Sequence, residues 1–390
     1  MKTNMKLKNL LSGLLIACAA TSCIQDEALN VEAAIDGCEG ENILLTNINH
    51  NSKEIEVYLP DIDLTKQELI FTLPIGAEIK IADANENDVQ PAFQKDSTWL
   101  CYCNFNQEKQ RRLTVTSEDG ANGVDYILRI NTMNLSDYTK YSFEELKQTS
   151  PYHILYLTTE SGIMQWASGN PGFEISGMAN DAADYPTVQA ADGVNGKCVK
   201  LTTRDTGNFG KPIGMPIAAG NLFIGSFDVQ NAVQHPLEAT NFGFPFNKKP
   251  LKMTGYYKYK AGETFTDEDK NPVAGKMDMG DIYAALYEAP TSDYSLDGDL
   301  FPLDGPMKDH IVSLARIGKD DNPNMTETDE WTRFELDFQL QNGKQINEAD
   351  LKEGKYKLAV VFTSSIEGAY FRGAIGSELC IDEVEIIYEQ

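Results

Sequence analysis

Three side chains in this chain have the chemistry to hold a sugar: Trp166, Tyr257 and Arg372. A pyranose ring packs its apolar side on an aromatic face and takes a few directed hydrogen bonds. Trp166 lies in a polar, glycine-containing stretch, residues 165–172, and is the first choice for the aromatic platform. Tyr257 alternates with Tyr256 along a predicted strand, so only one of these rings faces the core. Arg372 lies in a predicted loop and offers donors, although such arginines more often pair with surface carboxylates, and aromatic rings more often fill a core.

Catalysis finds little support in the sequence. The four histidines, His50, His153, His235 and His310, are far apart and have no metal-binding spacing. The motifs GxSxG and HExxH and the phosphate-binding loop are absent. A glycoside hydrolase needs only two carboxylates about 5 to 10 Å apart, which a sequence does not reveal. The chain is therefore expected to be non-catalytic, with a glycoside hydrolase as the enzymatic alternative.

One acidic segment imitates a calcium-binding loop but lacks its key residue. Asp267, Asp269 and Asn271 alternate, and Asp278 occupies the twelfth position. Pro272, however, stands where such a loop needs glycine for its sharp turn. We interpret the segment as a solvated acidic loop.

The start of the chain has the anatomy of an export signal. Three lysines precede an apolar run in residues 10–23 that is too short to span a bilayer and has small residues before a cysteine. It resembles a bacterial lipoprotein signal, residues 1–22, after which Cys23, or alternatively Cys18, is acylated. Acidic residues at 25–27 resemble the surface-export signal of Bacteroides-type lipoproteins. The resemblance implies an outer-membrane protein that is lipid-anchored, exposed at the cell surface and in contact with the membrane through its lipid only.

Charge and cysteine content narrow the partners. The 390 residues include 59 acidic and 33 basic side chains, for a net charge of −26. Such a surface repels phosphate backbones, which excludes nucleic acid and leaves neutral glycans as compatible partners. The cysteines beyond the signal are odd in number and have no CxxC spacing, so neither a disulfide framework nor a zinc site is indicated.

The region of residues 27–133 consists of short runs of alternating apolar and polar residues. Ile55, Val57 and Leu59 form one such run. About 100 residues of this pattern predict a small sandwich, and its motifs resemble the immunoglobulin-like modules that follow the lipid in Bacteroides surface proteins. We expect this domain to act as a spacer, followed by a polar linker at residues 134–140.

Strand patterns return over residues 141–390. Ser142 and Glu145 form a capping-box pair that predicts a short helix at the start. The rest has long loops and no alternating helices, which predicts one large antiparallel sandwich of jelly-roll type and an all-β fold class. The predicted strands cover residues 197–203, 220–227, 251–259, 282–288, 334–340, 356–362 and 381–388.

An ordered series of motifs in this second region resembles a known family. The motifs are AAGNLFIG at 218–225, FGFPF at 242–246, PLKMTGYYKY at 250–259, SS at 364–365, FRGAIGS at 371–377 and LCIDEV at 379–384. Together they resemble the "putative carbohydrate metabolism domain" (PCMD) of Bacteroidetes lipoproteins over residues 141–390. The resemblance implies a carbohydrate-binding jelly roll and brings no catalytic residues with it.

Two further pieces resemble galactose-binding-like carbohydrate modules. Asn170-Pro-Gly-Phe-Glu174 and Ile381-Asp-Glu-Val384 correspond to motifs on first and last strands that adjoin in those modules and hold a structural calcium. The resemblance makes Glu174 and Asp382 candidate calcium ligands, although calcium takes roughly six to eight oxygens. The alternative is that both are ordinary polar residues at strand ends.

These features together predict a surface lipoprotein whose C-terminal jelly roll binds glycan without cleaving it. A glycoside hydrolase acting on polysaccharide and a structural or adhesive cell-surface protein are the alternatives.

Overall fold

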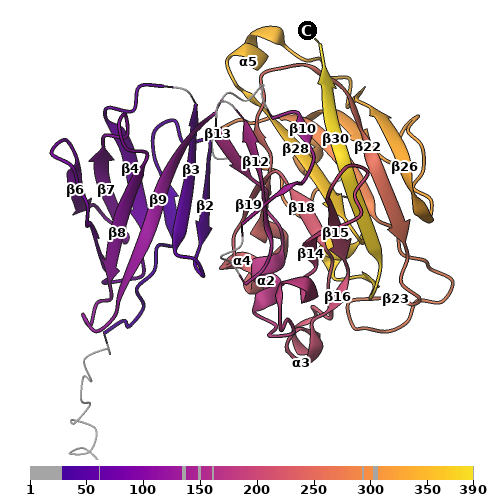
Figure 1. Cartoon of the computed structure of the whole chain (residues 1–390), viewed down its shortest axis with the longest axis horizontal. Helices are drawn as coiled ribbons and strands as arrows, with labels where there is room; N and C mark the ends of the chain where they lie inside the picture. The colour runs from indigo at the N-terminus through magenta and orange to yellow at the C-terminus, as the bar shows by residue number, and fades with distance from the viewer. Residues whose placement is uncertain are drawn as a thin grey trace, which may run out of the picture.

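The computed structural model describes residues 29–60, 62–133, 138–147, 151–159, 162–291, 294–301 and 306–389. The candidate lipidation sites, Cys23 and Cys18, lie outside these residues, as do residues 134–137 of the predicted linker. The described chain forms two β-sandwiches side by side, which confirms the all-β fold class (Figure 1). No helix in the described ranges has the length and hydropathy needed to cross a membrane.

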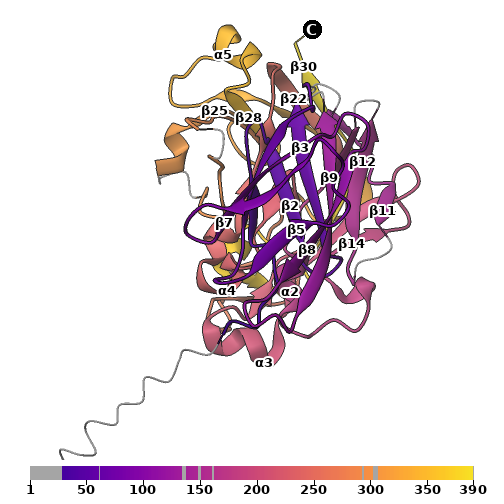
Figure 2. The same cartoon turned by 90° about the vertical axis from the view of Figure 1, so that its left-hand side faces the viewer.

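The first sandwich, which faces the viewer in Figure 2, packs two sheets around one core. Val57, Phe71 and Leu113 point inward from three different strands and are fully buried. One sheet has the order β1 (Gly37–Glu39), β4 (Gln67–Thr72), β7 (Thr98–Cys103) and β6 (Val89–Phe93). The other has the order β2 (Leu45–Asn49), β3 (Glu54–Pro60), β9 (Gly123–Met133), β8 (Gln110–Thr116) and β5 (Glu78–Ile81). Its immunoglobulin-like assignment stays a prediction.

The second sandwich is larger and wholly antiparallel within its two main sheets. The first of these has the order β14 (Thr187–Ala190), β15 (Cys198–Thr202), β30 (Glu378–Tyr388), β22 (Pro250–Lys260) and β26 (Thr328–Asp337), with β10 (Lys140–Tyr141) also beside β30. The other has the order β18 (Asn221–Phe223), β28 (Tyr356–Thr363), β24 (Asp281–Glu288), β25 (Ile311–Arg316) and β27 (Gln339–Leu340), with β21 (Phe244–Pro245) also beside β28.

Small elements surround these sheets. The short strands are β11 (Glu145–Lys147), β12 (Ile154–Thr159), β13 (Gly162–Gln165), β16 (Arg204–Asp205), β17 (Ile217–Ala218), β19 (Gly225–Phe227), β20 (Thr240–Phe242), β23 (Phe265–Thr266) and β29 (Gly373–Ala374). The α-helices are α2 (Asn170–Glu174), α3 (Gly207–Gly210), α4 (Asn231–Gln234) and α5 (Glu348–Lys352). The 3-10 helices are η2 (Ala182–Asp184), η3 (Lys211–Ile213), η4 (Pro236–Ala239), η5 (Pro306–Asp309) and η6 (Gly368–Tyr370).

The sheet containing β24 is buried on both faces. Ile282 and Leu286 point into the main core, while Tyr283 and Tyr287 point to the outer face, because successive side chains of a strand alternate. Loops cover this outer face, and that cover creates the space for a ligand cavity. The helix predicted from Ser142 is wrong, since Glu145 begins strand β11, which pairs with β12.

The two sandwiches share a packed junction. Tyr58 of β3 is fully buried within the main core of the second sandwich, and its ring meets Phe244 edge-on at 5.8 Å between centroids. Its hydroxyl accepts a hydrogen bond of 3.0 Å from the backbone N–H of Gln165. The first domain is therefore packed directly on the second rather than serving only as a spacer.

Candidate functional site

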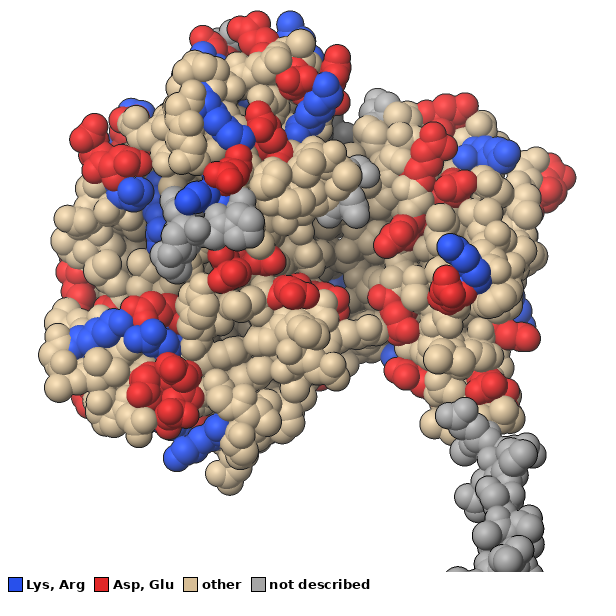
Figure 3. Space-filling model, turned by 180° about the vertical axis from the view of Figure 1, so that it is seen from behind, with Lys and Arg blue, Asp and Glu red and all other residues tan. Residues whose placement is uncertain are grey.

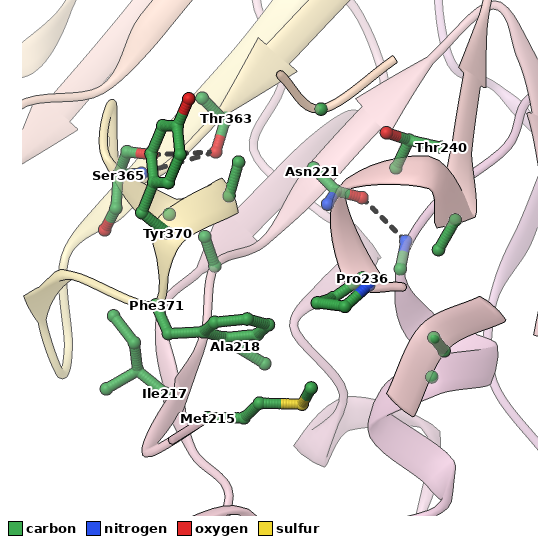
Figure 4. A pocket seen from close by; sticks show the side chains of 18 of the residues that line it. Met215, Ile217, Ala218, Asn221, Pro236, Thr240, Thr363, Ser365, Tyr370 and Phe371 are labelled. Carbon is green, nitrogen blue, oxygen red and sulfur yellow. Dashed lines mark hydrogen bonds between the residues drawn. The ribbon is translucent and has the colours of Figure 1, made fainter. Parts of the chain in front are cut away.

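A cavity of about 200 Å³ lies on the outer face of the sheet formed by β18, β28, β24 and β25. Its floor comes from the strands, including Tyr283 of β24 and Thr363 of β28. Segments that are well separated in the sequence form its walls (Figure 4). The labelled wall and floor residues are Met215, Ile217, Ala218, Asn221, Pro236, Thr240, Thr363, Ser365, Tyr370 and Phe371.

The walls are mainly apolar, with Phe371 at their centre. Its ring extends toward Ala218 and Ile217 in Figure 4. Phe371 closes η6 in the left-handed region, at φ 57°, which only a few per cent of non-glycine residues adopt. Such backbone conformations persist where the surroundings fix them, and they concentrate at functional sites. This conformation directs an aromatic face into the cavity.

One cavity carboxylate is committed to an internal ion pair. Asp281 is 2% exposed, and both of its oxygens accept hydrogen bonds from Nε of Arg316, at 3.1 and 2.9 Å. The guanidinium also lies over the ring of Phe301, 3.6 Å from its centroid. A carboxylate neutralised in this way holds the floor together and is not free to act as a base or nucleophile.

A second carboxylate, Asp297, lines the cavity and forms no ion pair with a cationic side chain of the described residues. Burial raises its pKa above the ordinary aspartate value, and the nearby carboxylates Asp299 and Glu238 add to the effect. Its side chain accepts a hydrogen bond of 2.8 Å from the backbone N–H of Asp299. Asp299 in turn accepts one of 2.7 Å from the hydroxyl of Tyr370, which ties this loop to η6.

The cavity also contains an unpaired hydroxyl. Oγ1 of Thr240 is buried and has no hydrogen-bond partner among the described residues. Another lining residue, Asn221, accepts a hydrogen bond of 2.6 Å at Oδ1 from the backbone N–H of Gly169. A buried hydroxyl without a partner is costly, so Thr240 is suited to receive a polar group of a ligand.

Asp278 anchors the wall that carries Phe371. It is buried, and its Oδ2 accepts hydrogen bonds from the hydroxyls of Ser365 and Ser377 and the backbone N–H of Ala374, at 2.5, 2.7 and 2.7 Å. These bonds fix both ends of the 365–377 segment. The segment contains the SS and FRGAIGS motifs, which therefore owe their residue types to this network. Asp278, which occupies the twelfth position of the segment that imitates a calcium-binding loop, is thus a structural anchor.

The structure corrects the sugar-platform predictions for Trp166 and Tyr257. Trp166 is 3% exposed and is surrounded by the rings of Tyr141, Phe143 and Phe362. Tyr257 is also 3% exposed, and its hydroxyl accepts a hydrogen bond of 3.1 Å from the backbone N–H of Thr326. Both rings belong to the core, so neither is an open sugar platform, although Trp166 also contributes to the lining of a cavity between the two sandwiches.

Arg372 lies next to the cavity wall but its guanidinium is directed elsewhere. Its Nε lies 3.3 Å from a carboxylate oxygen of Glu367 and 3.6 Å from one of Glu268. This is the surface ion pairing expected as the commoner role of such an arginine. Its neighbour Phe371 is the cavity residue.

Glu174 and Asp382 do not form a calcium site together. Glu174 belongs to the one-turn helix α2 and accepts a hydrogen bond from Nδ2 of Asn51 in the first sandwich. Asp382 is fully buried in β30, where Oδ2 accepts backbone N–H groups of Val194 and Asn195 at 2.7 and 3.2 Å. The described residues contain no group of three or more His, Cys, Asp or Glu side chains that would hold a metal ion. This donor set does not fit calcium, which needs roughly six to eight oxygens.

Sequence reasoning missed the residues that the cavity brings together. Asp297-Gly-Asp299 is correctly predicted as a turn, and the turn places Asp297 in the cavity. Phe371 begins a motif of the family series and Tyr370 directly precedes it, but nothing local marks them as cavity residues. The sequence signal that could have located these cavity residues was the clustering of aromatic and acidic residues in two loops of one domain.

The fold and cavity define a two-sheet sandwich with a ligand-sized cavity on one sheet, and comparison with known proteins gives its family. Residues 142–387 match the family described as "Putative carbohydrate metabolism domain", and the chain belongs to it. The second sandwich is therefore a carbohydrate-related domain.

Two solved structures are similar to this chain. The crystal structure of a "putative glycoside hydrolase" from Bacteroides thetaiotaomicron is 43% identical with a TM-score of 0.77, and the match covers 94% of this chain and 99% of that one. That of a "putative glycoside hydrolase" from Bacteroides vulgatus is 39% identical with a TM-score of 0.59, covering 64% and 98% respectively. No curated protein matches the chain.

Proposed function

We propose that the second sandwich binds a neutral glycan unit in the outer cavity, the roughly 200 Å³ space over β24 and β28. The observation that carries the proposal is the composition of the wall. Phe371 supplies an aromatic face, and Thr240 and Asp297 supply polar groups without strong internal partners. An apolar cavity with a few directed polar groups is the usual form of a small-ligand site.

The lining favours an uncharged sugar. No described residue that lines the outer cavity is Lys or Arg, and the nearby Arg316 is paired with Asp281. Uronic acids and sulfated sugars would meet Asp297 without a compensating cation. Neutral hexoses avoid this charge repulsion.

Binding without cleavage is the preferred form of this proposal. Cleavage by the usual route needs two carboxylates, one as acid and one as base or nucleophile. Of the two that line the outer cavity, Asp281 is held by Arg316 and only Asp297 is uncommitted. A glycoside hydrolase is the second candidate, favoured by the raised pKa of Asp297, which suits a general acid, and by the names of the two similar structures.

We also propose that the protein is a lipoprotein anchored through Cys23, or alternatively Cys18, at the outer surface of the outer membrane. The basic and apolar start of the chain and the acidic residues at 25–27 support this location. Mass measurement of the mature N-terminus distinguishes the two cysteines, and an unacylated product would contradict the anchor.

The binding test is a glycan array read together with an assay for released sugar. The chain from Asp26 onward is compared with Phe371→Ala and with Phe93→Ala, a control at an exposed phenylalanine of the first sandwich. We expect glycan binding without release, weakened about fivefold by Phe371→Ala and unchanged by Phe93→Ala, since an aromatic contact contributes about 1 kcal/mol.

Each other result overturns part of the proposal. Sugar release that Asp297→Asn abolishes would establish the hydrolase instead. Silence in both assays would favour the structural or adhesive alternative.

A further inference from the structure

A second cavity lies at the junction of the two sandwiches. It has a volume of about 230 Å³ and is lined by residues 47–51 of the first sandwich and, in the second, by residues 152–155 and 165–168, by Pro171, Glu174 and Ile175, and by further residues. The space-filling view shows a notch between the lower parts of the two sandwiches (Figure 3). Domain junctions are frequent locations of ligand sites.

Asn47 marks this junction cavity as a site for a hydrogen-bonding ligand. Its side chain lines the cavity, and the residue is only 9% exposed. Its Nδ2 is buried and has no hydrogen-bond partner among the described residues. A buried amide donor without an acceptor destabilises a fold, so a ligand oxygen here would satisfy a group that the fold leaves unpaired.

Two imidazoles add neutral donors and acceptors. His153 accepts a hydrogen bond of 2.8 Å at Nδ1 from the backbone N–H of Gln189, which places its proton on Nε2 as a donor. His50 lies with Nδ1 3.4 Å from the hydroxyl of Tyr126. Burial lowers the pKa of both histidines, so each ring is neutral at physiological pH. The junction cavity thus offers uncharged hydrogen-bonding groups from both sandwiches.

The opposite wall of the junction cavity is apolar and acidic. Pro171, Ile175 and Val229 provide the apolar surface. Glu174 accepts a hydrogen bond from Asn51 across the junction. No described residue of the lining is Lys or Arg, so an anionic ligand would meet a carboxylate without a cation. The lining thus combines polar and apolar groups, and a pyranose ring has both a polar and an apolar side.

Helix α2 separates this cavity from the outer one. Pro171 and Glu174 line the junction cavity, whereas Gly172 and Phe173 line the outer cavity. Phe227 lines both, and a Cβ on Gly172 would approach its ring to 3.0 Å. The glycine of the NPGFE motif therefore permits the thin partition between two neighbouring cavities.

We propose that the junction cavity is a second sugar site, which takes one neutral, polyhydroxylated unit with Asn47 and His153 as donors. The site is built from both domains, so it exists only in the packed two-sandwich chain. It uses a different set of polar groups from the outer cavity, and its occupancy is independent of Phe371.

The test uses the chain from Asp26 onward and a panel of free monosaccharides: glucose, galactose, mannose and N-acetylglucosamine. Saturation-transfer NMR detects binding, and the tryptophan emission reports its place, because Trp166 lines the junction cavity whereas the other two tryptophans, Trp99 and Trp331, do not. We expect Asn47→Leu to weaken the emission-linked binding about tenfold, since it removes one donor at similar volume. Phe371→Ala should leave it unchanged.

A second variant guards against effects on folding. Ile175 is 39% exposed, so Ile175→Trp fills the junction cavity from a surface position, and NMR should show the same loss of binding. Binding that Asn47→Leu and Ile175→Trp do not change, or a panel without any saturation transfer, would overturn the second site. Binding lost only in Phe371→Ala would overturn it while leaving the outer-cavity proposal intact. Loss only in Asn47→Leu and Ile175→Trp would establish the junction site, while the glycan array with Phe371→Ala decides the outer-cavity proposal separately.

Discussion

The two cavities have similar volumes, about 200 and 230 Å³, and share a wall, yet their linings differ. The outer cavity belongs to one sandwich, where loops cover the apolar outer face of a sheet. The junction cavity gathers asparagines and histidines, because strand ends and turns such as residues 47–51 meet there. Asparagine is favoured in turns for its side-chain hydrogen bonds, so a junction of turns is polar before any ligand is considered. The contrast teaches that sheet faces and turns give different ligand chemistries within one fold.

The acidic surface does not distinguish the two cavities. Asp and Glu side chains are spread over the visible face of both sandwiches in Figure 3. The net charge of −26 therefore disfavours anionic ligands at either cavity. The two cavities differ in their local lining. The outer cavity has an aromatic wall, and the junction cavity has an unpaired amide donor and two imidazoles.

The largest expected effect on stability comes from Tyr58→Ala, which disrupts only the junction between the two sandwiches. Tyr58 is fully buried, and its loss removes the contact with Phe244 and the hydroxyl that accepts from Gln165. We expect the free energy of unfolding to fall by about 3–5 kcal/mol, as for other large-to-small core changes. Urea unfolding measures it, and sugar titration should show loss of junction-cavity binding with the outer cavity retained where the variant is folded.

Tyr102→Ala is the matched control for this prediction. Tyr102 is a partly exposed tyrosine of the same sandwich, with a hydroxyl bonded to Glu68. A loss for Tyr58→Ala no greater than for Tyr102→Ala would contradict the packed junction.

Asp278→Ala is expected to damage the outer cavity and spare the junction. The change leaves the hydroxyls of Ser365 and Ser377 and the N–H of Ala374 without their acceptor. We expect a loss of about 2–4 kcal/mol in the free energy of unfolding, since each unsatisfied buried group costs about 1–3 kcal/mol and partial relaxation recovers some of it.

Asp269→Ala supplies the control for the Asp278 variant. Asp269 is an exposed residue of the same acidic segment, so its replacement should change stability by less than about 0.5 kcal/mol. Equal effects of the two variants, or a junction cavity that loses binding with Asp278→Ala, would show that the two cavities are not independently anchored.

Strands were predictable from the sequence because their signal is local. The alternation over residues 282–288 predicts a strand, and β24 covers Asp281–Glu288. The capping pair at Ser142 failed because pairing of β11 with β12 overrides a local helix signal. Tertiary contact decides such short segments.

The cavities were not predictable, because residues far apart in sequence form them. Trp166 lies in a polar stretch that suggested exposure, but Phe362, almost two hundred residues later, packs against it. Phe371 and Asp297 become neighbours of one cavity only through the cover of loops over the sheet. Family motifs located the right segments without indicating which side chains face a ligand.

A smaller effect is expected from Gln230→Ala, which tests whether polar contacts at the rim hold the junction. Nε2 of Gln230 donates a hydrogen bond of 2.8 Å to Asp36 across the two sandwiches, at an exposed position. We expect a loss of about 0.5–1 kcal/mol in unfolding free energy, since solvent replaces exposed hydrogen bonds. Urea unfolding of this variant and of Tyr58→Ala measures the ratio of the two losses in unfolding free energy. A loss comparable to that of Tyr58→Ala would mean that contacts at the rim, rather than the buried core, hold the junction together.

The smallest effect is expected from Asp297→Asn, which isolates the charge in the outer cavity. Burial raises the pKa of Asp297 in the folded protein, so the folded state holds its proton more tightly than the unfolded state. Its contribution to stability is therefore full below the ordinary aspartate pKa and is lost as pH rises through the folded pKa. Asparagine keeps the oxygen that accepts from Asp299 and never ionises. The variant should equal the wild type in acid and be more stable at neutral pH by about 0.5 kcal/mol, a small value because the group is only partly buried. Urea unfolding of both proteins across this pH range measures the gap, and a gap of opposite sign or one independent of pH would mean that the charge of Asp297 is already compensated in the cavity.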